Sequence, residues 1–176
     1  MAGIVKISET EITTAQTTVT IDNVFSNTYD VFMIKGVNIG SDTDNRTLQM
    51  RLIQDDGTVD VNGAYNTAKL LLSDFSTTIS RLETVDQTKF YVSRVGMGTG
   101  TDEYTNIIIY FFNTRVLGYT NILTIGSTLD NNVDFKMERG QGYHERTETI
   151  RGVTFQTDGG GKLDNGKFVV YGFKKS

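Results

Sequence analysis

Apolar and polar residues alternate with a period of two along much of this chain, and that pattern predicts β-strands. The segment RTLQMRLIQ (46–54) is the clearest case, because leucine or methionine occupies every second position from 48 to 52. No window of helical length carries apolar residues at i, i+3 and i+4 with matching caps. The best such window, NTAKLLLSDF (66–75), predicts one or two helical turns.

Turn residues divide the remaining chain into further short strands. The chain contains no proline, although an average content of ~5% would supply about nine, so Gly, Asn, Asp and Thr must form the turns. The dipeptide Asp56-Gly57 predicts a tight turn. Further strands are predicted in the opening stretch and at 17–25, 29–39, 89–95, 121–125, 133–138, 149–156 and 167–173.

Eight to ten strands without alternating helices predict an all-β fold, a two-sheet antiparallel sandwich. A jelly-roll-like arrangement is the specific prediction, and an immunoglobulin-like topology is the alternative. The length of 176 residues suits one domain. We assign residues 24–176 to a single β-sandwich and residues 1–23 to an N-terminal arm or first strands. An extended arm would add to the exposed edge of a neighbour, whereas first strands would close the domain's own sheet.

Charge and composition exclude several function classes. The net charge is −4, with 17 basic and 21 acidic residues and no basic stripe, so no nucleic-acid partner is predicted. Cysteine is absent, which excludes disulfides and thiolate chemistry. The N-terminus has no apolar region typical of a signal peptide, and no run approaches the ~18 residues of a membrane span. We therefore expect synthesis in the cytoplasm without a cleaved signal, and no membrane partner.

Residue types that support nucleophilic catalysis or phosphate binding are scarce. His144 is the only histidine, so a Ser-His-Asp triad would need it as base, and its polar surroundings, GQGYHERTE, predict a solvated loop residue. The glycine-rich stretch 96–100 is followed by Asp102, Glu103 and then a strand, instead of the helix that a phosphate cradle requires. The stretch GGGK at 159–162 is likewise followed by a strand and predicts a hairpin loop.

Acidic residues offer two further kinds of site. The pairs Asp42–Asp44 and Asp130–Asp134 resemble the carboxylate spacing of calcium loops, but these residue types also form ordinary turns, which is the interpretation we favour. A hydrolase with paired carboxylates stays an alternative, because such pairs are close in space and not in sequence. No catalytic, cofactor-binding or metal-binding residue is predicted.

The run Ile107–Phe112 is apolar at every position and therefore places apolar side chains on both faces of its sheet. Only one face of each sheet in an antiparallel sandwich belongs to the core. Leaving three of these side chains in water would forfeit roughly 5–8 kcal/mol, at about 1.5–3 kcal/mol each. Loops of the same chain or a second subunit would supply the cover. The interface candidates come from this run, from the equally two-sided segment 29–39 and from the N-terminal segment: Ile4, Val5, Ile7, Phe32, Ile34, Ile108, Tyr110 and Phe112.

Three stretches in order resemble a family of small β-rich virion structural proteins of tailed bacteriophages, notably marine phages such as cyanophages. They are VFSNTYDVFMIKGVNI (24–39), IIIYFFNTRVLGYTNI (107–122) and the closing KFVVYGFKK (167–175). The chain departs from the family pattern at Thr114, where a proline is common, and in a partly acidic loop before the second stretch. The resemblance implies a head decoration or cement subunit, or a tail- or fibre-associated one, without catalytic residues.

These observations predict a non-enzymatic structural subunit of a phage virion. It would form a homo-oligomer and bind neighbouring virion proteins through apolar surface, with no cofactor. The alternative is a receptor- or glycan-binding module of a tail fibre, with a host surface glycan as partner. That alternative rests on the sandwich fold and on the tyrosines near polar loops, such as Tyr65, Tyr104 and Tyr143.

Overall fold

The structure is a computed structural model that describes residues 3–74 and 76–174, and its fold is all-β. No helix occurs in these residues, and hence none that is long and apolar enough to cross a membrane. The described residues form twelve strands: β1 (Ile4–Glu11), β2 (Thr18–Ile21), β3 (Tyr29–Ser41), β4 (Leu48–Gln54), β5 (Tyr65–Ser73), β6 (Ser76–Gln87), β7 (Phe90–Tyr91), β8 (Thr105–Phe112), β9 (Thr120–Leu129), β10 (Phe135–His144), β11 (Ile150–Thr157) and β12 (Leu163–Lys174).

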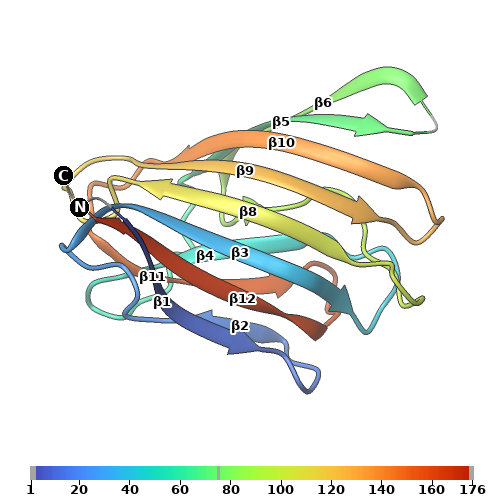
Figure 1. Cartoon of the computed structure of the whole chain (residues 1–176). Coiled ribbons are helices and arrows are strands. Elements are labelled where there is room, and N and C mark those ends of the chain that lie inside the picture. The colour runs from blue at the N-terminus through green and yellow to red at the C-terminus, as the bar shows by residue number, and fades with distance from the viewer. Residues whose placement is uncertain (1–2, 75, 175–176) are drawn as a thin grey trace.

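The strands pair as a jelly roll. The larger sheet has the order β1-β12-β3-β8-β9-β10-β5-β6, and the smaller sheet has the order β2-β11-β4-β7 (Figure 1). The chain begins and ends in one antiparallel pair, β1 with β12. Nested inside it are β2 with β11, β3 with β8 and β4 with β7, which alternate between the sheets. This rolled-up nesting defines the jelly roll and confirms the predicted fold class.

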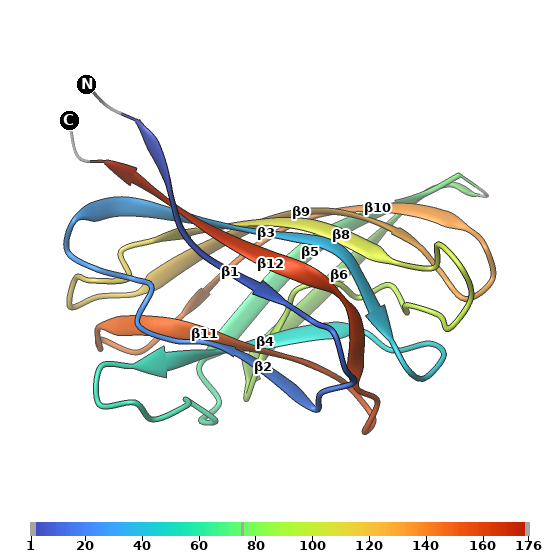
Figure 2. The same cartoon turned by 60° about the horizontal axis from the view of Figure 1, so that its bottom comes forward.

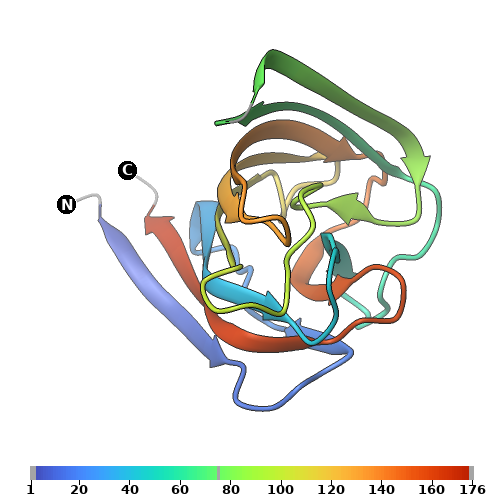
Figure 3. The same ribbon diagram turned by 90° about the vertical axis from the view of Figure 1, so that its right-hand side faces the viewer.

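Four strands are additions to the eight of the jelly roll. The hairpins β5–β6 and β9–β10 both extend the larger sheet beyond β8. Figure 2 shows the two layers edge-on, and Figure 3 shows the larger sheet as an arc from β1 to β6 with the smaller sheet on its inner side only. The larger sheet therefore has an outer face that the second layer does not cover.

The core fills the space between the two layers. Phe155 of β11 and Phe168 of β12 stack with ring centroids 4.1 Å apart, which joins one sheet to the other. Val19, Leu52 and Ile109 are also buried there, at the alternate positions of their strands. Burial of one face of each strand is the main source of stability in such a sandwich.

Several sequence predictions of local structure hold and others fail. The turn at Asp56-Gly57 is confirmed, since Gly57 has a φ of +90° and its N–H donates to the Gln54 carbonyl at 2.9 Å. The helical turns predicted at 66–75 are wrong as far as Ser73, because those residues form β5; Phe75 lies outside the described residues. The strand predicted at 89–95 is limited to β7, and β6 was not predicted. The twelve strands exceed the predicted eight to ten for this reason.

Candidate functional site

The outer face of the larger sheet is the candidate functional site, because it carries the second apolar side of β8. Ile107, Ile109 and Phe111 point into the core and are buried, whereas Ile108, Tyr110 and Phe112 point outward and are half-buried. Figure 1 looks onto this face, and no described strand or loop crosses it. The outward side chains are therefore shielded only by their neighbours in the same sheet.

Cross-strand register continues this apolar surface over five strands. Met33 of β3 lies between Tyr171 of β12 and Tyr110 of β8. Ile108 of β8 lies opposite Ile125 of β9, which is 41% exposed. We call this surface the outer apolar face and define it by Ile4, Val31, Met33, Ile108, Tyr110, Ile125, Tyr171 and Phe173. Contiguous exposed apolar surface of this kind is typical of association sites.

The interface candidates from the sequence divide into three groups. Ile108, Tyr110 and Phe112 lie on the outer side of the sheet, as the two-sided pattern required. Phe32 and Ile34 are a correction: both are 0% exposed in the core and cannot contact a partner. The error has a simple cause, since an apolar strand does not reveal which of its two faces is inward.

The N-terminal candidates belong to an edge strand of the same sandwich. Ile4 is 59% exposed and lies opposite Phe173 of β12, so it extends the outer apolar face. Val5 and Ile7 are half-buried, and Ile7 packs against the core. The described part of residues 1–23 contributes strands to both sheets, β1 to the larger and β2 to the smaller. β1 is hydrogen-bonded on one side only, so its other edge is free to pair.

The sequence also missed members of this surface. Tyr171 and Phe173 were not selected, although KFVVYGF (167–173) is apolar at consecutive positions in the same way as the β8 run. Ile125 was not selected because β9 alternates and its outward positions are mixed. A search for every strand that is apolar on both faces would have found the first two.

His144 is a second correction, because it is buried at the end of β10 and is not a solvated loop residue. Its ring is 0% exposed, its Nε2 lies 2.6 Å from Oδ2 of the equally buried Asp60, and its Nδ1 has no hydrogen-bond partner. The Tyr65 ring packs against the imidazole in a tilted arrangement, with centroids 4.7 Å apart and an angle of 46° between the ring planes. Burial lowers the pKa of His144 against the opposing effect of Asp60. A neutral, enclosed imidazole of this kind supports the fold and has no access to a substrate.

Two buried charged side chains, Lys69 of β5 and Glu138 of β10, lie on neighbouring strands. Lys69 is 3% exposed and its Nζ donates to the Val92 carbonyl at 2.5 Å. Glu138, also 3% exposed, accepts hydrogen bonds from Ser93 Oγ at 2.5 Å and from the Arg94 N–H at 2.9 Å. Burial lowers the pKa of Lys69, and the Glu138 charge opposes that shift. These contacts fix the segment after β7 against the inserted hairpin.

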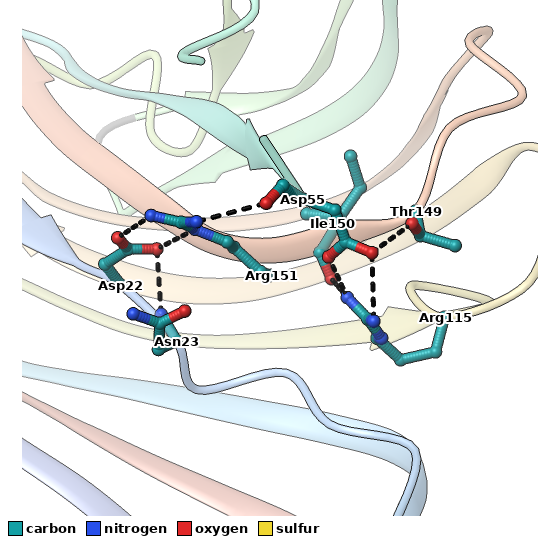
Figure 4. Close-up of polar contacts among 7 residues, drawn as sticks. All are labelled: Asp22, Asn23, Asp55, Arg115, Thr149, Ile150 and Arg151. Atoms are coloured by element: carbon teal, nitrogen blue, oxygen red, sulfur yellow. Dashed lines mark hydrogen bonds and ion pairs between the residues drawn. The ribbon is translucent and has the colours of Figure 1, made fainter. Parts of the chain in front are cut away.

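Two arginines tie together the loops at one end of the sandwich (Figure 4). Arg151 of β11 donates to both carboxylate oxygens of Asp22, from Nε at 2.9 Å and from Nη2 at 2.6 Å. Arg115 binds both carboxylate oxygens of Asp55, which also accepts from Thr149 Oγ1 at 2.5 Å. The hydrogen bonds from Arg151 lower the pKa of Asp22, and those from Arg115 lower the pKa of Asp55. Each charged group already has its partner, so the network acts as a structural tie.

The substitution Arg151→Ala tests this tie. We expect it to reduce the free energy of unfolding by about 1–2 kcal/mol at pH 7, because two charge-assisted hydrogen bonds at a partly exposed site are lost. Since the pKa of Asp22 is lowered on folding, the loss is present above about pH 4 and shrinks as acid protonates the carboxyl group. Urea denaturation at pH 7 and pH 3 measures both values. An equal loss at the two pH values would contradict the assignment, and Arg151→Lys, which keeps the charge, serves as the control.

The other candidate loops bind their own side chains. The glycine-rich loop at 96–100 wraps the Glu103 carboxylate, whose Oε2 accepts from the Gly100 N–H at 2.9 Å. Asp44 accepts from Thr99, and Asp130 accepts two backbone N–H groups and pairs with Lys136. In the described part of the chain, no group of three or more His, Asp or Glu side chains could hold a metal ion. These acidic residues therefore act as turn residues.

Comparisons with known proteins add no family. No protein-family model matches the sequence, and no curated protein matches it either.

Proposed function

We propose that this chain is a non-enzymatic structural subunit that self-associates through the outer apolar face, as a component of a phage virion. The observation that carries the proposal is the run of outward apolar side chains on five adjacent strands of one uncovered sheet face. Covering such side chains with a partner releases free energy at about 25 cal/mol per Å² of apolar surface. A second copy of the chain carries the same apolar face, so a two-fold symmetric pairing is the simplest way to cover it.

Two further observations support the proposal. The buried titratable side chains are enclosed in the fold and each already has a structural partner, which favours a non-enzymatic role; they are Asp60, His144, Lys69 and Glu138. The three stretches that resemble virion structural proteins include the strands β3, β8 and β12, which together carry most of the outer apolar face. The resemblance is the reason for placing the assembly in a virion and for expecting neighbouring virion proteins as partners.

The double substitution Met33→Lys/Tyr110→Glu tests the association. These residues lie directly opposite each other on β3 and β8, so the two new charges can form a cross-strand ion pair that preserves the sheet while placing charge in the interface. We expect the unaltered chain to sediment as an oligomer and the double variant as a monomer with an unchanged circular dichroism spectrum. Sedimentation velocity over a range of concentrations provides the measurement.

A matched control places the same two charges elsewhere. Val116 and Leu117 lie in the loop between β8 and β9 and are 58% and 77% exposed, so Val116→Lys/Leu117→Glu should leave the oligomer intact. A monomeric unaltered chain at high concentration, or equal dissociation of both variants, would refute self-association through this face. The virion assignment has its own test, since particles purified from cells that express the chain should contain it by mass spectrometry. Its absence from particles would refute that part alone.

A further inference from the structure

A groove crosses the other half of the outer side of the larger sheet, over the inserted hairpins. Its main hollow has a volume of about 590 Å³, within the ~300–1,000 Å³ of small-ligand sites. An adjoining hollow of about 380 Å³ continues it. The two share four lining residues, Ala68, Glu83, Leu123 and Gln141. We call the combined depression the outer groove; it lies beside the outer apolar face, which contributes none of its lining.

Strand register explains the shape of the outer groove. Gln141 of β10 lies opposite Leu123 of β9 on one side and Ala68 of β5 on the other, and Ala68 lies opposite Glu83 of β6. The four shared residues therefore form one row across four strands, with the small Ala68 side chain making the floor deep between two longer ones. The groove thus runs across the strands, perpendicular to their hydrogen-bonded edges.

The lining carries polar groups that have no partner in the protein. The side-chain amides of Asn121 and Gln141 are exposed and form no hydrogen bond with any residue in the described part of the chain. The same holds for the guanidinium groups of Arg81 and Arg139, which flank Leu70 across three adjacent strands. Both guanidinium groups are exposed and lie on the lining of the smaller hollow. Their charge complements an anionic ligand.

Aromatic side chains form the wall at the opposite end. Tyr143 of β10 lines the main hollow and is 36% exposed, and Tyr119 stacks against it with ring centroids 5.7 Å apart. Phe112 lines the same hollow. Stacked phenol rings present a flat apolar surface with a polar edge, which suits a ring that is itself apolar on its faces and hydroxylated around its rim.

We infer that the outer groove binds an acidic glycan, a chain of sugars that carries carboxylate or sulfate groups. The amides of Asn121 and Gln141 each offer a donor and an acceptor to sugar hydroxyl groups, and the Glu83 carboxylate accepts from them at two oxygens. Arg81 and Arg139 pair with the acidic groups, and the Tyr143 ring packs on a sugar face. This is a second activity of the chain, independent of self-association. Of the three tyrosines that the sequence suggested for glycan contact, only Tyr143 lines the groove; Tyr65 is buried in the core.

A glycan fits this groove better than a peptide does. An extended peptide gains most of its affinity by adding a strand to a sheet edge, and the outer groove crosses the sheet face, where no backbone donors or acceptors are free. Its lining also offers planar polar groups along an open floor in place of deep apolar sockets for side chains. A peptide ligand is therefore the competing outcome of the test.

Oligogalacturonate, a chain of uronic acids, provides the acidic probe, and a malto-oligosaccharide of equal length provides the neutral one. We expect the acidic chain to bind more tightly and to shift the side-chain amide NMR signals of Asn121 and Gln141. The double variant Arg81→Gln/Arg139→Gln should weaken binding about tenfold or more, because it removes charge-assisted hydrogen bonds. Tyr143→Ala should also weaken it, whereas Tyr143→Phe, which keeps the ring, should not.

A second double variant, Lys162→Gln/Lys174→Gln, removes two exposed charges away from the groove and should leave binding unchanged. Equal weakening by the two double variants would show non-specific attraction and overturn the inference. So would equal binding of both oligosaccharides, no binding of either, or binding of library peptides at these amide signals in place of glycans. The variant Ile4→Lys/Phe173→Glu places the two charges on β1 and β12, at the far end of the outer apolar face. It should dissociate the oligomer but still bind the acidic probe, which separates this inference from the proposed assembly.

Discussion

The substitution Asp60→Ala should remove about 3–5 kcal/mol from the free energy of unfolding, because it leaves the buried His144 ring and the Asn62 N–H without their acceptor, at about 1–3 kcal/mol each. Asp60 Oδ1 accepts from the Asn62 N–H at 2.8 Å, and its Oδ2 lies 2.6 Å from His144 Nε2. His144 Nδ1 already lacks a partner, so the alanine variant leaves both ring nitrogens buried without hydrogen bonds. Guanidinium denaturation followed by circular dichroism measures the loss.

The free energy of unfolding of the isosteric variant Asp60→Asn should lie between those of the unaltered chain and Asp60→Ala. Asparagine can still accept from Asn62, but its amide group can donate to His144 Nε2 only if the ring moves its proton to Nδ1. That tautomer buries an N–H donor without an acceptor, which costs about 1–3 kcal/mol. A loss in Asp60→Asn as large as that in Asp60→Ala would contradict this account of the pair.

The same pair makes stability depend on pH in an interval where few other groups titrate. His144 is the only histidine, and burial lowers its pKa in the folded state. Its contribution is therefore complete above the unfolded value of about 6.5 and is lost as the pH falls below that value toward the folded pKa. The unaltered chain should lose stability between pH 7.5 and pH 5, and His144→Gln should be less stable but nearly insensitive to pH there. An unchanged slope in the variant would refute the assignment.

The sequence predicts the fold class well because alternation reports which side of a strand is buried. It fails at the inserted hairpin β5–β6, where the run KLLL (69–72) is apolar or long-chained at consecutive positions. In the structure Leu70 and Leu72 point outward and are 45% and 40% exposed, whereas Lys69 points inward. Composition alone gives no reason to bury the lysine and expose the leucines. That choice depends on Glu138, which is distant in sequence.

The functional surfaces were predictable to different degrees. The apolar excess of the β8 run indicated that some surface needed cover, and Ile108, Tyr110 and Phe112 lie on that surface. Which face was inward depended on pairing with β3, so Phe32 and Ile34 were assigned to the wrong side. The outer groove was out of reach, because its floor combines single residues of four strands that only the sheet order brings together. Sequence patterns report faces of elements, whereas grooves across a sheet depend on strand order.

The buried Glu138 carboxylate gives the second large effect. Glu138→Ala should cost about 3–5 kcal/mol at pH 7, because it leaves Ser93 Oγ and the Arg94 N–H without their acceptor, at about 1–3 kcal/mol each, and removes the negative charge near the buried Lys69. Gly140, the cross-strand partner of Lys69, makes room for that side chain, since a Cβ there would lie 2.5 Å from Lys69 Cγ. Urea denaturation at pH 7 measures the loss.

The double variant Lys69→Met/Glu138→Leu separates charge from packing. Replacing buried charged groups of opposite sign by apolar residues of similar size is often neutral or stabilising, so the double variant should recover most of the stability that Glu138→Ala loses. The single variant should also regain stability relative to the unaltered chain between pH 7 and pH 10. Burial already lowers the pKa of Lys69 in the folded state, and removing Glu138 lowers it further. The unfolded chain then holds a proton that the folded chain does not, so the free energy of unfolding rises with pH until about pH 10.4, the unfolded pKa of lysine. Two results together would contradict this account: a double variant as unstable as Glu138→Ala, and a Glu138→Ala variant that gains no stability at high pH. They would show that packing around Glu138, and not its charge, holds the inserted hairpin to the jelly roll.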